Sequence, residues 1–312
     1  MNTDLSLKII FMGTPDFAVP TLEMLQASRH HIQAVVTIPD KQQGRGQRFR
    51  ASAVKQAAVA LGLPLLQPVN LRAPEFADEL KQLAPDIIVV VAFQILPEDV
   101  FSIPRLGSFN LHASLLPRYR GAAPIHWALL NGDSESGVTT FFLKRKVDTG
   151  NIILQRSLPI ATEDDLHSLY AKLCAIGADL VLDTVDQISS GIVKESTQDN
   201  MLATPAPKVT AGTQTLNFEQ SAEQCHNRVR AFAPSPGAFT YRNGARLKIL
   251  LTHVGEASGI PGQVVEVSAD SFTIACKQGS LVIRSVQPES KKPMEAAAYL
   301  RGNPLTIGDE IG

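Results

Sequence analysis

Short apolar runs alternate with segments of helical periodicity through the first 190 residues of the chain. The apolar run at residues 7–12 ends in a turn at residues 13–16, and a helical pattern begins at Phe17. The chain therefore opens as a strand, a turn and a helix. The run at residues 87–92 is continuous and rich in β-branched side chains, which is typical of a strand buried on both faces of a parallel sheet.

The same alternation continues and predicts one doubly wound α/β domain over residues 1–190. Further strands are expected at residues 32–38, 63–66, 107–113, 137–143 and 152–158. Helices are expected at residues 51–61, 75–83, 122–130 and 164–189. The sheet should be mostly parallel and Rossmann-like. The first turn has one glycine, Gly13, whereas the dinucleotide-binding motif G-x-G-x-x-G needs three, and no P-loop is present.

The pattern changes beyond residue 190. Residues 191–208 are rich in Ser, Thr, Gln and Asn and contain two prolines, so a linker is expected there. A short helix at residues 222–231 is followed by strands at 238–241, 247–254, 263–267, 272–276 and 280–286. Short strands separated by turns predict a small OB-like barrel over residues 209–312. Such barrels often bind nucleic acid, but the fold alone does not establish a function.

The composition is that of a soluble globular enzyme. The chain has 312 residues, of which 44% are hydrophobic and 19% charged. Its longest apolar run, near residues 87–93, is too short to cross a membrane, and its first residues do not resemble a secretory signal. Three scattered cysteines suggest neither a disulfide framework nor a zinc cluster. We therefore expect a cytoplasmic protein without a metal.

The formal net charge of −1 conceals a basic segment. Residues 41–74 contain no acidic residue but several basic ones, including Arg45. A nearly neutral protein that binds nucleic acid must use local patches of this kind. A solvated loop would give the same pattern, so both interpretations remain open.

Candidate catalytic residues follow the strand expected at residues 107–113. Asn110, His112 and Ser114 are spaced two apart, so on an extended strand their side chains point to one face. The carboxyl ends of parallel strands are where open α/β sheets bind ligands. Asp148, in a Val-Asp-Thr-Gly segment, would supply a carboxylate beside the histidine. Taken singly, a structural histidine and an ordinary turn explain these residues equally well.

Several motifs together resemble the methionyl-tRNA formyltransferase family. They are Gly13-Thr14-Pro15-Asp16-Phe17, Asn110-x-His112-x-Ser114-Leu115-Leu116-Pro117 and Asp148-Thr149-Gly150. The resemblance extends over nearly the whole chain. The Asn-x-His and Asp-x-Gly set alone is shared with glycinamide ribonucleotide and sugar-amine formyltransferases, whereas the basic loop and the barrel favour the tRNA enzymes.

The resemblance implies transfer of a formyl group from 10-formyltetrahydrofolate to the amino group of methionine on initiator methionyl-tRNA. Asn110 would stabilise the negatively charged oxygen of the tetrahedral adduct. His112 would accept the proton of the attacking amine, and Asp148 would orient the imidazole ring. No metal is required.

The resemblance also implies a folate pocket. Its lining would include Phe93, Ile95, Ser114, Leu115, Leu116 and Pro117. The chain departs from the family pattern at residues 92–97, which are one residue shorter and lack a glycine, and at Lys146-Val147 before Asp148. These departures concern the shape of the pocket and leave the three catalytic candidates in place.

The remaining contacts that the resemblance implies are with tRNA. Separately, we expect the protein to act as a monomer. The loop around Arg45 would reach the acceptor end of the tRNA. Phe17 would hold the methionyl group or be a core aromatic residue, and Lys208 would touch the RNA backbone or be an ordinary surface lysine. Candidate phosphate contacts in the barrel are Arg228, Arg230, Arg242, Arg246 and Lys248.

Three other functions remain possible at this point. A sugar- or nucleotide-amine formyltransferase would use the same catalytic set without needing the basic loop. A hydrolase would release formate from the same folate without an amine acceptor. A catalytically inactive RNA-binding protein would bind tRNA and transfer nothing, although the complete Asn-His-Asp set argues against it.

Overall fold

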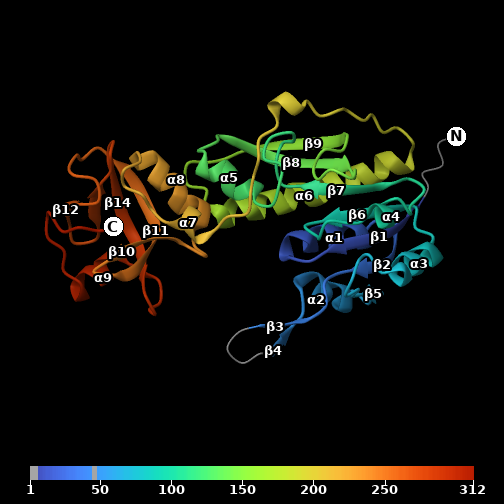
Figure 1. Cartoon of the computed structure of the whole chain (residues 1–312), viewed down its shortest axis with the longest axis horizontal. Coiled ribbons are helices and arrows are strands. Elements are labelled where there is room, and N and C mark those ends of the chain that lie inside the picture. Colours follow the sequence, from blue (N-terminus) through green and yellow to red (C-terminus); the bar gives the residue numbers. More distant parts are fainter. Residues whose placement is uncertain (1–5, 44–47) are drawn as a thin grey trace. The chain divides into compact units, whose positions relative to one another are not determined.

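The computed structural model describes residues 6–43 and 48–312, and the chain divides into two compact units (Figure 1). The first unit contains Met1–Gly121, Gly137–Leu158 and Tyr170–Pro205. The second contains Ala122–Ser136, Pro159–Leu169 and Ala206–Gly312. Each unit therefore combines stretches that are separated in the sequence.

A seven-stranded sheet forms the centre of the first unit, in the order β5-β2-β1-β6-β7-β8-β9. The strands are β1 Lys8–Gly13, β2 His31–Val36, β5 Leu65–Leu66, β6 Ile87–Val91, β7 Ser108–His112, β8 Glu135–Phe142 and β9 Ile152–Pro159. The pairings from β5 to β7 are parallel, and β8 pairs with β7 antiparallel. The predicted Rossmann-like α/β fold is confirmed.

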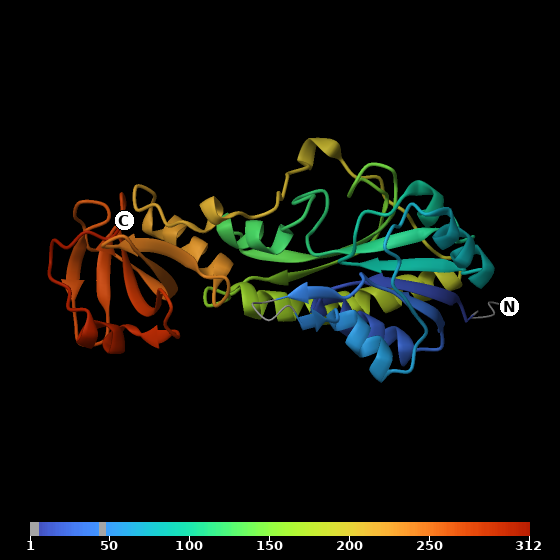
Figure 2. The ribbon, with the colours of Figure 1, turned by 60° about the horizontal axis from the view of Figure 1, so that its bottom comes forward.

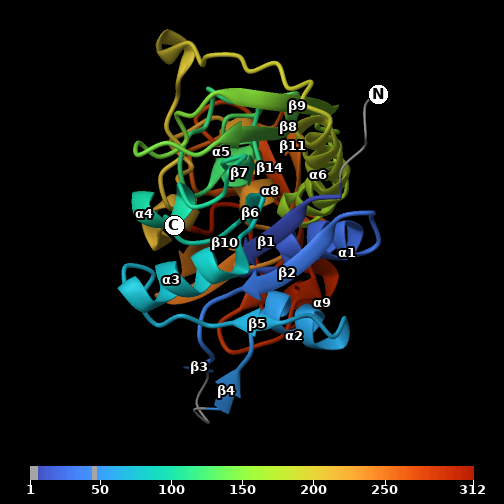
Figure 3. The ribbon, with the colours of Figure 1, turned by 90° about the vertical axis from the view of Figure 1, so that its right-hand side faces the viewer.

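Helices cover both faces of this sheet, with α1 and α6 on one side and α3 and α4 on the other (Figure 3). The helices of the unit are α1 Val19–Gln26, α2 Ala53–Ala60, α3 Pro74–Leu83, α4 Glu98–Phe101 and α6 Leu166–Ser189, with short 3₁₀ turns η1 Asp16–Ala18 and η2 Asn200–Leu202. Alternate strand residues such as Ile10 and Val90 pack against Phe76 and Leu80 of α3. On the other face, a Cβ at Gly177 of α6 would come within 2.8 Å of Leu111. None of the described helices is long and apolar enough to span a membrane.

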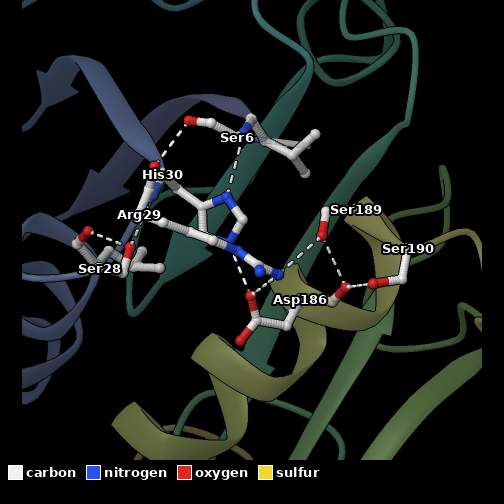
Figure 4. A network of polar contacts seen from close by, with 9 residues as sticks. Ser6, Ser28, Arg29, His30, Asp186, Ser189 and Ser190 are labelled. Atoms are coloured by element: carbon white, nitrogen blue, oxygen red, sulfur yellow. Dashed lines mark hydrogen bonds and ion pairs between the residues drawn. The ribbon is translucent and has the colours of Figure 1, made fainter. Parts of the chain in front are cut away.

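The end of α6 is fastened to the starts of β1 and β2 by a polar network (Figure 4). His30 accepts a hydrogen bond from the Leu7 amide at Nδ1, at 3.2 Å, so Nε2 carries the proton that it donates to Asp186 at 3.0 Å. Arg29 adds an exposed ion pair to the same carboxylate. These contacts lie at the amino ends of the strands, away from the edge where ligands bind.

The second unit is built on a sheet of strands (orange to red in Figure 2). The sheet is antiparallel, in the order β10-β11-β14-β13-β12, with β15 pairing with β14. Its strands are β10 Ala238–Arg242, β11 Ala245–Gly255, β12 Val264–Val267, β13 Phe272–Ala275, β14 Ser280–Pro288 and β15 Met294–Glu295. Its helices are α5 Pro124–Leu130, α7 Ala211–Gln214, α8 Ala222–Phe232 and α9 Ala296–Gly302.

The last residues of the chain connect the two edges of this sheet. Ile311 donates its amide to Gly262 beside β12, at 2.9 Å, and Gly312 donates to Tyr241 of β10, at 3.0 Å. The described C-terminal segment thus bonds to one residue of β10 and to residues at and beside β12, which pairs part of each exposed edge. The described strands β10 and β12 do not pair with each other, so the unit is an antiparallel sheet with linked edges, and the prediction of a strand-rich second part is confirmed.

Two features differ from the sequence-based expectations. Residues 39–50, predicted as a loop, contain a short antiparallel hairpin of β3 Lys41–Gln43 and β4 Arg48–Arg50. Helix α5, predicted within the α/β domain, belongs to the second unit. There its Trp127 indole donates to the Pro207 carbonyl at 2.8 Å, and His126 packs on Phe232.

Candidate active site

Strand β7 brings two of the candidate catalytic residues to the carboxyl edge of the sheet. Asn110 pairs with Val90 of β6, and His112 ends the strand. Phe109 and Leu111, which alternate with them, are buried and fix the strand in the core. The Asn110 side chain is half-buried at a cavity and has no hydrogen-bond partner among the described residues. Its amide N–H groups are therefore available to a ligand.

The surroundings of His112 define which ring nitrogen carries a proton. Nε2 lies 2.8 Å from the carbonyl oxygen of Tyr119, and a carbonyl can only accept, so Nε2 is the donor. Nδ1 lies 3.9 Å from Oδ2 of Asp148. The ring is buried and contacts Phe141 edge-on, with 6.5 Å between centroids. The neutral imidazole therefore keeps its lone pair on Nδ1, on the side of the carboxylate.

Asp148 is held in an uncommon backbone conformation. Its φ is +54°, in the left-handed region that non-glycine residues rarely adopt. Oδ2 accepts a hydrogen bond from the Gly121 amide at 2.8 Å, and the side chain lines the same cavity as Asn110. Asn110, His112 and Asp148, which lie far apart in the sequence, therefore meet at one edge of the sheet.

A cavity of about 110 Å³ lies beside Asn110 and Asp148, whereas the buried His112 is not among the described residues that line it. Most of its walls are apolar, with Asn110, Asp148, Gln94, Lys144 and Arg145 as the polar side chains. Its apolar lining residues are Val90, Phe93, Ile95, Leu96, Phe101, Phe141, Leu143 and Val147. Two residues predicted for the folate pocket, Phe93 and Ile95, are among them. A mostly apolar hollow with a few convergent polar groups suits a flat heterocyclic ligand.

The other residues predicted for the folate pocket, Ser114, Leu115, Leu116 and Pro117, are absent from the described residues that line this cavity. They form a turn behind the histidine. The Ser114 hydroxyl donates to the Arg118 carbonyl at 2.7 Å, and the Leu116 amide donates to the Thr139 hydroxyl at 3.1 Å. Leu116 is buried against Phe141. This turn supports the wall from which the cavity is built.

A segment that the sequence predicts as a linker runs along the catalytic loops. We call residues 196–205 the strap. It forms a bridge with Ile152 at Ser196 and one with Arg120 at Pro205. Gln198 donates to the backbone carbonyls of Asp148 and Gly150, and Thr204 accepts from the Tyr119 amide. Sequence reasoning missed these residues, because a segment rich in Ser, Thr, Gln and Asn gives no signal of burial.

The residues predicted to contact tRNA lie in different settings. Arg45 falls outside the described residues. Phe17 is buried, with its ring 5.3 Å from that of Tyr170. Burial and a hydrogen bond to Asp16 raise the pKa of the Tyr170 hydroxyl, so it stays protonated beside this ring. Lys208 is exposed.

Three of the candidate phosphate contacts in the barrel have internal partners. The guanidinium groups of Arg228, Arg230 and Arg242 donate to backbone carbonyls of their own unit. Arg246 lies over the ring of Phe239, with 4.6 Å from its guanidinium carbon to the ring centroid. Arg228, Arg230 and Arg242 therefore act mainly within the fold.

No group of three or more His, Cys, Asp or Glu side chains in the described part of the chain is arranged to hold a metal ion.

Comparison with known families identifies both parts of the chain. Residues 7–185 match the formyl transferase family, and residues 208–304 match the formyl transferase C-terminal domain family. The chain is 44% identical to the methionyl-tRNA formyltransferase of Moorella thermoacetica over 98% of its own length and 99% of the relative. It is 42% identical to the methionyl-tRNA formyltransferase of Pelobacter propionicus over 98% and 97% of the two chains.

A solved structure of similar fold is WlaRD, a sugar 3N-formyl transferase determined in the presence of dTDP and 5-N-formyl-THF. The TM-score is 0.66 at 22% sequence identity, covering 92% of this chain and all of that one (100%). At this identity the likeness concerns the fold.

Proposed function

The chain belongs to the formyltransferase family, among the methionyl-tRNA formyltransferases, and we therefore propose that it formylates the amino group of methionine on initiator methionyl-tRNA. The formyl donor in this proposal is 10-formyltetrahydrofolate. The observation that supports it most is that Asn110 and Asp148 line one cavity while His112 lies buried next to Asp148. We also propose that residues 1–190 carry the chemistry, that the protein acts as a monomer and that it works in the cytoplasm.

The role proposed for Asn110 follows from the charge that develops during the reaction. Attack of the amine on the formyl carbon forms a tetrahedral adduct with negative charge on the former carbonyl oxygen. The Asn110 amide has no internal partner among the described residues and faces the cavity, so its N–H can donate to that oxygen. A donor aimed at a developing oxyanion stabilises the transition state more than the ground state.

His112 is proposed to move the proton. The amine nitrogen bonds to the formyl carbon and loses a proton, which Nδ1 accepts directly or through water. The imidazolium then has both N–H groups directed at acceptors, Nε2 toward Tyr119 and Nδ1 toward Asp148. When the adduct collapses, the bond from carbon to N10 breaks and the same proton returns to N10. No net proton is gained or lost by the protein.

The folate is proposed to lie in the cavity, with Phe93 and Ile95 in its walls. Ser114, Leu115, Leu116 and Pro117 would act by supporting the wall rather than by touching the ligand, because they form the turn behind His112. The residues on this chain fit such a ligand, since mostly apolar walls surround a few polar side chains, Asn110 and Asp148 among them.

The tRNA is proposed to contact the basic segment and the barrel of residues 209–312. Arg45 would meet the acceptor end, Lys208 the RNA backbone and Phe17 the neighbourhood of the methionyl group. Phe17 is buried against Tyr170, so its contribution would come from shaping that site. Phosphate contacts supply affinity but no sequence discrimination.

The test of the proposed function is a direct assay of formyl-methionyl-tRNA formation with 10-formyltetrahydrofolate. We expect transfer by the natural protein, and a loss of about 10²- to 10⁴-fold in kcat/KM for His112→Ala and a comparable loss for Asn110→Ala. His31→Ala, an exposed position on β2, serves as a matched control with unchanged activity.

The assay also separates the competing functions. Folded His112→Ala or Asn110→Ala protein with near-full turnover would exclude this mechanism. Faster formylation of a small sugar amine than of methionyl-tRNA would indicate a sugar-amine formyltransferase instead. Release of formate without an acceptor would indicate a hydrolase.

A further inference from the structure

The strap carries a buried glutamine, Gln198, whose amide nitrogen and amide oxygen both form hydrogen bonds. Gln198 is buried, and its Nε2 donates to the carbonyl oxygens of Asp148, at 3.0 Å, and of Gly150, at 2.8 Å. These two carbonyls belong to Asp148 itself and to the residue two positions after it. A side chain from the strap therefore holds the backbone that directly follows the Cα of a candidate catalytic residue.

The orientation of this amide is fixed from its other end. Oε1 of Gln198 accepts from Nε of Arg120 at 3.0 Å and from a terminal guanidinium nitrogen of Arg120 at 2.7 Å. The third donor of Arg120 goes to Asn200 at 2.9 Å. A flipped amide would set N–H groups against the guanidinium and an oxygen against two carbonyls. The glutamine can bind in only one way.

The segment that Gln198 holds is sterically demanding. Asp148 has φ of +54°, a left-handed conformation that is strained for a residue with a Cβ. A Cβ on Gly150 would lie 1.5 Å from the carbonyl oxygen of Phe142, so the segment lies directly against β8. Its conformation persists because neighbouring groups, Gln198 among them, bind its carbonyls.

We propose that Gln198 is a positioning residue for formyl transfer, which keeps the Asp148 carboxylate directed at His112 by binding the carbonyls of residues 148 and 150. The inference rests on the proposed function. Without the two N–H donors, the buried carbonyls lose their partners, the segment relaxes and Oδ2 moves away from Nδ1. Displacements of about 1 Å at a distance from the reacting atoms can cost about 10²-fold in rate.

The substitution Gln198→Glu tests this role because it removes the N–H donors of the side chain and keeps its acceptor oxygen. Glutamate has the same length and keeps an acceptor for Arg120, so the strap stays anchored. It removes both N–H donors and sets an oxygen against the two carbonyls. We expect kcat to fall about 10- to 100-fold, with KM for the folate changed less than about threefold. Gln198→Ala should show a similar loss in kcat.

Controls come from the same segment. Met201 on η2 is 91% exposed, so Met201→Ala should leave kcat unchanged. If Gln198→Glu does not fold, Gln198→Met, which is of similar length, uncharged and without N–H donors, replaces it with the same expected loss. Wild-type kcat in either folded variant would overturn the proposal and leave Gln198 as an anchor of the strap.

A spectroscopic measurement keeps this inference separable from the proposed function. The ¹⁵N resonances of the His112 imidazole report its tautomer and its neighbours without requiring turnover. We expect them to shift in Gln198→Glu and to stay in place in Met201→Ala; unshifted resonances in Gln198→Glu would overturn the positioning role. Absence of formyl transfer by the natural protein would refute the proposed function while leaving the outcome at His112 to decide the role of Gln198.

Discussion

Histidine side chains of this protein bind partners outside their own helix or strand. His112 donates to Tyr119 and faces Asp148, and in the barrel His226 bonds through Nδ1 to the Thr252 hydroxyl at 2.8 Å. The two histidines serve different ends. His112 lies against Asp148, which lines a cavity, whereas His226 lies between α8 and β11 within a packed unit, where a positive charge would be poorly solvated.

His226 should make the stability of the second unit depend on pH. Burial, followed by the charges of Arg230 and His253, lowers the pKa of His226 to about 4 from 6.5. Between these values the unfolded chain binds a proton that the folded unit does not, so the free energy of unfolding falls as the pH drops from 6.5 toward 4 and is level above 6.5. Partial solvent screening limits the change to on the order of 1–2 kcal/mol.

The measurement is urea denaturation followed by fluorescence of Trp127, which belongs to the second unit and is the single tryptophan of the chain. His226→Gln, which retains a partner for Thr252, should flatten the slope between pH 6.5 and 4.5. His167→Gln, at an exposed position of the same unit, should leave the slope unchanged. An identical slope in His226→Gln and the natural protein would contradict the assignment.

How far single residues could be predicted depended on whether their neighbours were local. Asn110 and His112 alternate on one strand, so their shared face could be read from the spacing. Gln198 could not be identified in this way, because its partners lie 48 and 50 residues earlier. Likewise, the arginines of the barrel look alike in sequence, and only their carbonyl partners distinguish Arg228 and Arg242 from surface arginines.

At the scale of elements, the β3–β4 hairpin rests on a polar network at its base. Asp40, directly before β3, accepts from Lys55 of α2 at 2.7 Å and from Gln67 at 3.1 Å. Hydrogen bonds from Lys55 and Gln67 lower the pKa of Asp40. The sequence predicted a loop here because strands of three residues are too short to show an alternating pattern, whereas the long strands and α6 were predicted correctly.

This hairpin gives a prediction that separates tRNA use from folate binding. Arg45, which lies outside the described residues, is the cation between β3 and β4. We expect Arg45→Ala to raise KM for methionyl-tRNA about tenfold, because one phosphate contact is lost, and to leave the Kd of folate unchanged. Steady-state kinetics and equilibrium binding of tetrahydrofolate measure the two quantities.

The control is Lys81→Ala, which removes an exposed positive charge from α3 in the same unit. It should alter neither quantity. A raised ionic strength should reduce the difference between Arg45→Ala and the natural protein, since the contact is electrostatic. Equal weakening of tRNA and folate binding by Arg45→Ala would contradict the proposed role of the hairpin.

At the scale of the whole molecule, each unit is assembled from separate stretches of the chain. Residues 122–136 and 159–169 join the barrel unit, where Arg230 of α8 donates to the carbonyls of Ala161, Thr162 and Asp164. Alternation of strands and helices predicted the fold class of the first part, and short strands separated by turns predicted a strand-rich second part. The sequence pattern could not predict that these two stretches belong to the second unit, because it shows which face of an element is buried and not which element covers that face.

The last prediction concerns residues 309–312, which link the two edges of the second sheet. Ile311 is buried. The Ile311 amide donates to Gly262 and the Gly312 amide to Tyr241, and the Val264 amide donates to Asp309. Deleting residues 309–312 removes the buried Ile311 side chain, uncovers the surface that it packs on and leaves the hydrogen-bonding groups of Val264, Gly262 and Tyr241 without these partners. We expect the free energy of unfolding of the second unit to fall by about 2–4 kcal/mol, seen as a lower urea midpoint of Trp127 fluorescence.

Two point substitutions separate the contribution of the buried Ile311 side chain to this loss of stability from that of the backbone hydrogen bonds. Ile311→Ala keeps the backbone bonds and loses only the buried side chain, so it should reproduce part of the loss, whereas Ile307→Ala changes a side chain that is 73% exposed and should change nothing. Tetrahydrofolate binding, which we assign to the first unit, should be unaffected by the deletion. An unchanged urea midpoint after deletion would mean that the sheet is stable with both edges open, because burial of Ile311 and the edge hydrogen bonds would then contribute nothing measurable.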